Sequence, residues 1–266
     1  MAGNYIHIPF CTSKCRYCDF TSYPGKIGFA DAYMACVYKE MKLRSADLKD
    51  KVFDTVYIGG GTPSVIDAKW IVGCMNQIRA CYTLAPDAEV TIEMNPGTVT
   101  AEKIQTYKRA GVNRFSIGLQ TAIDAQLEEL GRRHTAADFV EACRLLGDVN
   151  KSADIMIGLK GQTSGDIRKS IDLAAEQGVS HISMYALTPE DGTPIYTDYL
   201  NGELPDADEV AALYDSARTY LKQLGFERYE VSNFAKKGFE ARHNLNYWRR
   251  GEYIGFGVDA SSFMCN

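Results

Sequence analysis

Short runs of apolar and β-branched residues alternate along this chain with longer stretches in which apolar side chains recur every three or four positions. The runs predict strands, and residues 52–58 are apolar or β-branched at nearly every position, a pattern typical of a strand buried on both faces. The longer stretches predict helices. The expected strands are residues 4–8, 55–59, 89–95, 114–119, 153–157 and 181–187, and the expected helices are residues 28–43, 67–82, 101–110, 124–130, 136–149 and 164–177.

The alternation of strand and helix predicts β-α-β units and hence a parallel sheet. Six such units fit into 266 residues, so we expect an α/β fold whose main body is an open (β/α)6 partial TIM barrel. In barrels of parallel strands, functional sites form at the C-terminal ends of the strands. The residues that follow each predicted strand are therefore the candidates for a site.

Three cysteines follow the first strand at C-x-x-x-C-x-x-C spacing, as Cys11, Cys15 and Cys18. Pro9 and Phe10 end the strand, so the cysteines fall on a loop where three soft thiolates can converge on one iron–sulfur cluster. Because a [4Fe–4S] cluster usually takes four cysteines, one iron would be left open to a small molecule. A zinc site that lacks its fourth ligand and a chance grouping are the alternatives, although zinc sites more often use C-x-x-C pairs.

This loop, with its preceding strand and the aromatic Tyr17 beside Cys18, resembles the signature of the radical S-adenosylmethionine (radical SAM) enzymes. The resemblance implies a [4Fe–4S] cluster whose open iron is chelated by the amino and carboxylate groups of SAM. It also implies that an electron from the cluster cleaves SAM to a 5′-deoxyadenosyl radical. Such chemistry needs an electron donor, such as a flavodoxin or a ferredoxin.

The composition indicates in which compartment this chemistry would take place and which partners it excludes. The net charge of −5 gives no basic field that would favour nucleic acid as a partner. No apolar run reaches the length of a membrane span, and the first residues lack a secretory pattern. Eight cysteines without a signal peptide indicate a reducing compartment rather than a disulfide framework. We therefore expect a cytoplasmic protein with no transmembrane segment.

Glycines and polar residues follow the other strands and are candidates for holding SAM. Gly60, Gly61 and Thr62 follow the second strand; glycines let a backbone approach a ligand closely, although the same pattern also makes an ordinary strand-to-helix turn. Glu93 lies in the third strand, where a carboxylate in a barrel mouth needs a partner. The Arg132 guanidinium could meet the SAM carboxylate as a bidentate donor, the alternative being a solvated helix end.

Longer segments narrow the resemblance to one family. Residues 5–20, 59–64, 93–97, 116–120, 130–134, 154–163 and 229–235, and the run His243-Asn244-Leu245-Asn246-Tyr247-Trp248, recur in order in the HemW-type haem chaperones, relatives of the oxygen-independent coproporphyrinogen III oxidases. The resemblance covers nearly the whole chain. It implies cluster ligation by Cys11, Cys15 and Cys18, and SAM contacts from Tyr5, Tyr17, Gly60, Gly61, Thr62, Glu93, Gln120, Arg132 and Asp154.

Two functions follow from this resemblance. In the first, a haem chaperone binds haem and passes it to an apo-haemoprotein, with the cluster supporting assembly or transfer. In the second, a coproporphyrinogen III oxidase decarboxylates propionate side chains after the radical abstracts hydrogen. The oxidase branch typically has a fourth cysteine two positions after Cys18, where this chain has Phe20, so we favour the chaperone. Whether the site turns over as an enzyme is left open, as is a third function, a radical SAM enzyme that acts on haem itself.

His243 is the candidate haem ligand, because imidazole is a common axial ligand of haem iron. Tyr247 and Trp248 offer flat apolar surfaces to the macrocycle, and Arg249 and Arg250 can pair with propionates. The alternative is a structural segment in which His243 caps a turn and the aromatic residues pack on the barrel.

The chain departs from the family at three places. Lys160 stands where the family usually has proline, which loosens a turn but removes no ligand. Residues 255–262 differ from the family's glycine-alanine-histidine-serine run, and its histidine is absent. The family normally continues as a C-terminal domain beyond the last residue of this chain. We therefore expect a radical SAM core barrel over residues 1–205 and, over residues 206–266, the beginning of a truncated α+β region with a helix over 208–224 and a strand over 227–232.

Overall fold

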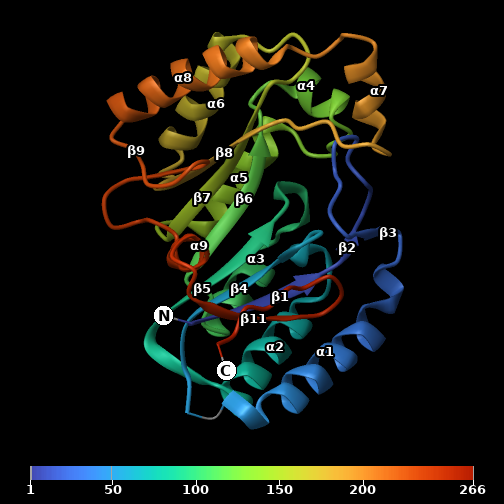
Figure 1. The fold of residues 1–266 in the computed structure, drawn as a ribbon, viewed down its shortest axis with the longest axis vertical. Helices are drawn as coiled ribbons and strands as arrows, with labels where there is room; N and C mark the ends of the chain where they lie inside the picture. The colour runs from blue at the N-terminus through green and yellow to red at the C-terminus, as the bar shows by residue number, and fades with distance from the viewer. Residues whose placement is uncertain (1, 49, 266) are drawn as a thin grey trace.

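The computed structural model describes residues 2–48 and 50–265, which a nine-stranded sheet organises (Figure 1). Its centre is parallel and follows the chain order. At one edge β11 (Glu252–Phe256) adds in parallel to the first strand, and at the other β10 (Asn233–Ala235) and β9 (Glu227–Arg228) add antiparallel. Within these described residues the two edges do not pair, so the barrel is open. The central strands are β1 (Ala2–Ile8), β4 (Val52–Gly60), β5 (Thr83–Met94), β6 (Arg114–Gln120), β7 (Asn150–Ile157) and β8 (His181–Ala186).

The crossover helices cover the outer face of this sheet (Figure 1), whereas α9 (Arg242–Trp248) lies against the lumen-facing Glu89, which accepts from the N–H groups of Arg242 and His243. Two of the crossover helices begin with capping boxes, in which Thr135 pairs with Asp138 and Thr163 pairs with Asp166, and such reciprocal bonds satisfy the free N–H groups of a first turn. The crossover helices are α1 (Ala30–Arg44), α2 (Ala68–Cys81), α3 (Ala101–Arg109), α4 (Asp124–Glu129), α5 (Ala136–Leu146) and α6 (Ser164–Glu176), and the later helices are α7 (Pro194–Leu200), α8 (Ala207–Gln223) and α9 (Arg242–Trp248).

Each barrel strand divides its side chains between two faces, because successive side chains of a strand point to opposite sides. Ile6 and Ile8 of β1, like Phe115 and Ile117 of β6, join the hydrophobic core beneath the helices. The alternate positions carry polar side chains, which therefore line the barrel lumen. On β6 these are Arg114, Ser116 and Gln120, and on β5 they are Glu89, Thr91 and Glu93.

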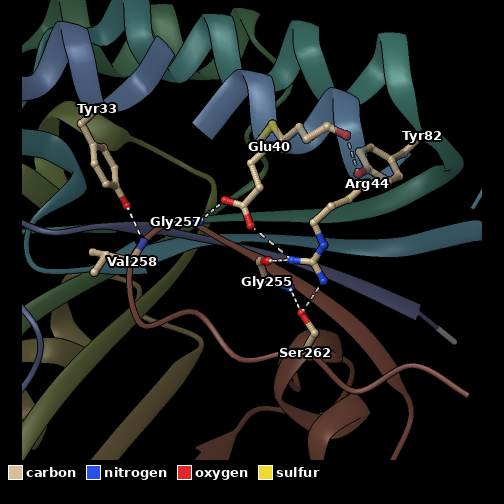
Figure 2. A network of polar contacts seen from close by, with 9 residues as sticks. Tyr33, Glu40, Arg44, Tyr82, Gly255, Gly257, Val258 and Ser262 are labelled. Carbon is tan, nitrogen blue, oxygen red and sulfur yellow. Dashed lines mark hydrogen bonds and ion pairs between the residues drawn. The ribbon is translucent and has the colours of Figure 1, made fainter. Parts of the chain in front are cut away.

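Helix α1 holds the segment that follows β11 through a network of polar contacts (Figure 2). Arg44 donates from Nη1 to the Gly255 carbonyl at 2.7 Å and from Nη2 to Ser262 Oγ at 3.0 Å. The Glu40 carboxylate accepts from the Gly257 N–H at 2.9 Å. These bonds fix residues 255–262, the run whose sequence departs from the family, against the outside of the barrel.

The structure confirms the predicted α/β class and the open parallel barrel, and each predicted barrel strand overlaps an observed one. The sequence did not predict β10 or β11. The boundary between residues 205 and 206 stays a prediction, although β9, β10 and β11 from beyond it join the barrel sheet. None of the helices in the described part of the chain is long and apolar enough to cross a membrane.

Candidate functional site

The cysteine loop leaves the C-terminal end of β1, where β2 (Phe10–Cys11) runs into it and β3 (Tyr23–Pro24) ends it. Cys11 is buried, and Cys15 and Cys18 are half-buried. All three are free thiols. They lie close enough for the charge on Cys15 and Cys18 to raise the pKa of Cys11, and for Cys15 to raise that of Cys18, in addition to the larger effect of burial. The structure thus gathers the three predicted ligands in one place.

The glycine segment after β4 packs directly against this loop. Its backbone donates from the Gly61 N–H to the Ile8 carbonyl at 2.9 Å and from the Thr62 N–H to the Phe10 carbonyl at 2.8 Å. A Cβ on Gly61 would lie 2.8 Å from the Phe10 oxygen and 3.0 Å from Cys11 Sγ, so only glycine fits. This contact is closer than an ordinary strand-to-helix turn requires.

The donor set fits a [4Fe–4S] cluster better than a single metal ion. Three free thiols converge on one loop, and thiolates are the ligands that iron–sulfur clusters use. Within residues 2–48 and 50–265, no three His, Cys, Asp or Glu side chains are placed to hold one metal ion. A cluster distributes its thiolates over different irons, so it needs no such convergence on one point.

Glu93 points from β5 toward the glycine segment. Its Oε1 accepts from the Tyr57 hydroxyl at 2.6 Å, and its Oε2 accepts from the Gly60 N–H at 3.0 Å. The pKa of Glu93 is raised to about 7, mainly by burial and also by the nearby Asp154 carboxylate, against the bonds from Tyr57 and Gly60, which lower it. The carboxylate is thus held beside the glycine backbone, where it can accept from a ligand ammonium group.

Arg132 reaches the same place from the other side of the lumen. Its Nη2 donates to the Gly118 carbonyl at 2.9 Å, and its Nη1 lies 3.4 Å from the Tyr17 hydroxyl and 3.7 Å from Cys15 Sγ. Its buried Nε has no hydrogen-bond partner among the described residues. A buried donor without a partner is costly, so the guanidinium has capacity left for an anionic ligand such as the SAM carboxylate.

The remaining predicted SAM residues also face the lumen near these two groups. Gln120 adopts a left-handed backbone conformation, with φ of 68°, at a register shift between β6 and β7, and its side chain lies beside Gly118 and Arg132. Asp154 accepts from Ser116 Oγ at 3.3 Å. Tyr5 stacks on Tyr57 with ring centroids 6.2 Å apart. The partly bonded carboxylate, the unpaired guanidinium nitrogen and the glycine backbone together fit a zwitterionic amino acid such as the methionine part of SAM.

His243 lies next to these residues, because its ring stacks on Tyr57 with ring centroids 5.1 Å apart, and it also lies beside Gly3 of β1. Its Nδ1 lies 2.7 Å from Thr55 Oγ1, and its Nε2 lies 2.8 Å from the Tyr247 hydroxyl. The side chain is buried, and burial lowers its pKa to about 3. Both ring nitrogens are engaged, as in the structural alternative considered from sequence, so haem ligation by His243 stays a prediction that this geometry does not support.

Two residues of the barrel lumen were not predicted from the sequence. The Tyr57 hydroxyl donates to Glu93, but Tyr57 lies in a run that is apolar or β-branched at nearly every position. Arg114 is 2% exposed, and its Nε has no partner among the described residues; its charge lowers the pKa values of Glu93 and Asp154. The alternation of polar residues at Arg114, Ser116 and Gln120 was the signal for a lumen-facing row.

The environment of Glu93 predicts a pH-dependent stability. Because its pKa in the folded protein is about 7 rather than 4.5, the folded state binds more protons than the unfolded chain between these values. The contribution of Glu93 to the free energy of unfolding should therefore fall, by up to about 3 kcal/mol, as the pH rises through this window. The buried histidines His134, His181 and His243, whose pKa values burial lowers, contribute in the opposite sense. In denaturation of cluster-free protein, the free energy of unfolding of the wild type minus that of Glu93→Gln should fall across the window.

The matched control is Glu102→Gln, which removes an exposed glutamate on α3. It should follow the wild-type profile, because this carboxylate is in contact with solvent in the folded protein as it is in the unfolded chain. Superimposable profiles for wild type and Glu93→Gln would refute the raised pKa.

Comparisons with known proteins agree with this geometry. The family model for the Radical SAM superfamily matches residues 5–174, a span that holds the cysteine loop and every predicted SAM residue. The chain is 37% identical over 259 residues to the Heme chaperone HemW of Buchnera aphidicola subsp. Schizaphis graminum, covering 96% of this chain and 68% of the relative. It is 39% identical over 269 residues to the Heme chaperone HemW of Escherichia coli (strain K12), again covering 96% and 68%.

One solved structure shares most of the fold. Coproporphyrinogen III oxidase (HemN) from Escherichia coli superposes with a TM-score of 0.86, over 99% of this chain and 64% of that chain. The sequences are 20% identical, so this similarity concerns the fold alone. The chain spans about two thirds of the length of the relatives named here.

Proposed function

Because the chain belongs to the radical SAM superfamily and, within it, to the HemW family, we propose that it binds haem and transfers it to an apo-haemoprotein. The observation that carries the proposal is its identity of 37% and 39% to proteins named Heme chaperone HemW along 96% of its length. Since the chain spans about two thirds of those relatives, the activity of the whole protein is part of the proposal.

The superfamily takes a [4Fe–4S] cluster and SAM as cofactors. In this chain Cys11, Cys15 and Cys18 would hold the cluster. When bound, the two cofactors supply an electron and a cleavable sulfonium. Around them the chain would orient SAM through Glu93 on its ammonium and Arg132 on its carboxylate, with Tyr5, Tyr17, Gly60, Gly61, Thr62, Gln120 and Asp154 completing the pocket. A flavodoxin or ferredoxin would donate the electron.

The residue that separates the chaperone from the oxidase lies on the cysteine loop. Phe20 occupies the position where the oxidases have their additional cysteine, and its side chain is 69% exposed. No thiol is therefore available at this point of the loop. We place the protein in the cytoplasm, since its eight cysteines are free thiols and a reducing compartment keeps them so.

The test is a pair of assays on anaerobically reconstituted protein. Haem titration should give saturable binding, and the loaded protein should transfer haem to an apo-haemoprotein faster than an equal amount of free haem does. With reductant and SAM, the protein should produce no protoporphyrinogen IX from coproporphyrinogen III, because Phe20 replaces the additional cysteine. Catalytic turnover of the porphyrinogen, detected by chromatography, would favour the oxidase and overturn the proposal.

A further inference from the structure

A pocket of about 610 Å³ opens between α9, β11 and the segment after β11. Four of its eight lining residues are aromatic, and we call it the aromatic pocket. Tyr253 packs edge-on against Tyr247 with ring centroids 4.6 Å apart, and it lies 6.4 Å from the Phe263 ring. The backbones of Tyr253 and Phe263 exchange two hydrogen bonds of 2.8 Å. The residues that matter here are Tyr5, Tyr247, Arg250, Tyr253, Asp259 and Phe263.

Two residues with left-handed backbone conformations line the same pocket. Among the described residues, three other than glycine have positive φ, namely Gln120, Arg250 and Asp259. Gln120 is a predicted SAM contact, and the other two line the aromatic pocket, with φ of 53° and 60°. For Arg250 this conformation comes from the end of α9. Its N–H donates to the Tyr247 carbonyl at 2.9 Å and the Gly251 N–H donates to the Asn246 carbonyl at 2.8 Å, the bonds of a common helix C-terminus. The end of the helix therefore fixes where Arg250 lies at the pocket wall.

The pocket adjoins the site already described. Tyr5 belongs to both, because it lines the pocket and also stacks on Tyr57, the residue that holds Glu93. Asp259 Oδ2 accepts from Thr21 Oγ1 of the cysteine loop at 2.5 Å, which ties the pocket wall to that loop. Arg250 is exposed and therefore supplies an available positive charge at the pocket wall.

We propose that the aromatic pocket binds the tetrapyrrole cargo by its ring and by one propionate paired with Arg250, not by an imidazole bond from His243 to the iron; this rests on the proposed function. The volume of about 610 Å³ lies within the range of pockets that hold cofactors and other small molecules. Tyr247, Tyr253 and Phe263 offer ring faces and edges to a flat macrocycle. Arginine pairs with carboxylates through two parallel bonds. His243 is 2% exposed with both nitrogens bonded, so it offers the iron no free ligand atom.

The experiment titrates the full chain with haem and, separately, with iron-free protoporphyrin IX, following the Soret band. Because the ring and the propionate carry recognition, the two dissociation constants should agree within about tenfold. Arg250→Gln should weaken binding of both ligands by roughly tenfold or more, the loss expected for a charge-assisted hydrogen bond. The matched control, Arg228→Gln, removes the same charge from an exposed residue on β9, outside the pocket, and should change either constant less than about twofold.

A second variant tests the ring contact independently. Phe263→Ala truncates a side chain that is 45% exposed, so the fold should tolerate it. It should weaken both ligands several-fold, whereas Phe239→Ala, at a residue that is 41% exposed and outside the pocket, should not. Thermal unfolding verifies that each variant is folded.

The outcomes separate the two proposals. Failure of the wild type to bind haem overturns the proposed function and this inference together. Haem binding that survives both Arg250→Gln and Phe263→Ala overturns the inference alone. Haem bound more than about a hundredfold tighter than protoporphyrin IX would show that a protein ligand holds the iron, and would also overturn it.

Discussion

Replacing Cys15 with alanine is expected to abolish the iron–sulfur cluster. The loop offers three free thiols in one place, and two thiolates cannot hold four irons stably. Cys15 is half-buried and is not part of the hydrophobic core. The variant therefore removes a ligand, and a contact of 3.7 Å to Arg132 Nη1, without leaving a cavity in the core. After anaerobic reconstitution, iron and sulfide analysis and the visible absorption band should report almost complete loss.

The control for this prediction is another cysteine of the same chain. Cys36 is exposed on α1, away from the loop, so Cys36→Ala should retain the wild-type iron and sulfide content. The same loss is expected for Cys11→Ala and Cys18→Ala. Full iron and sulfide in any of these three loop variants would show that the cluster is held elsewhere.

The order of strands and helices was predictable because each barrel strand carries its own signal. β6 reads as a short run bounded by helices, and all its residues are buried, as expected of a strand covered on both sides. The strand β11 was missed for a physical reason. It begins with Glu252 and Tyr253 and contains Gly255, and its place beside β1 is fixed by the long-range bonds of Arg44 and Glu40, which no local pattern reveals.

The residues of the candidate site were predictable where they lie at or directly after the end of a barrel strand. The cysteine spacing, the glycine segment and Glu93 each come directly after or within a strand of the barrel. What the sequence did not reveal is how these groups are held. The bond from Tyr57 to Glu93 joins positions 36 residues apart, and the haem role expected of His243 overlooked the partner Thr55, which lies 188 residues away.

The aromatic pocket also could not be predicted from the sequence alone. Tyr247 and Arg250 were named from the sequence, but Trp248 and Arg249 were named beside them on equal terms. Only the fold separates the two pairs, since Tyr247 and Arg250 line the pocket and the others do not. One helical turn distributes neighbouring side chains around the axis, so adjacent residues in sequence need not share a site.

The second large effect concerns Arg132, whose replacement by glutamine should weaken SAM binding without removing the cluster. Its Nε is buried without a partner among the described residues, and its Nη2 is anchored on the Gly118 carbonyl. The guanidinium therefore keeps a donor available for an anionic group such as the SAM carboxylate. Loss of a charge-assisted hydrogen bond costs about 1.5–3 kcal/mol, so the dissociation constant should rise roughly tenfold to a hundredfold.

Arg133→Gln is the matched control, because it removes the same charge from the next residue, which is exposed. Titration of reconstituted protein with SAM should give a wild-type constant for Arg133→Gln. Arg132→Lys should fall between the two, since lysine keeps the charge but not the planar fork that meets a carboxylate with two bonds. Iron content, measured in the same samples, must stay equal. With equal iron, an unchanged SAM affinity in Arg132→Gln would remove this residue from the site. An equal loss of SAM affinity in Arg132→Gln and Arg133→Gln would assign the effect to net charge.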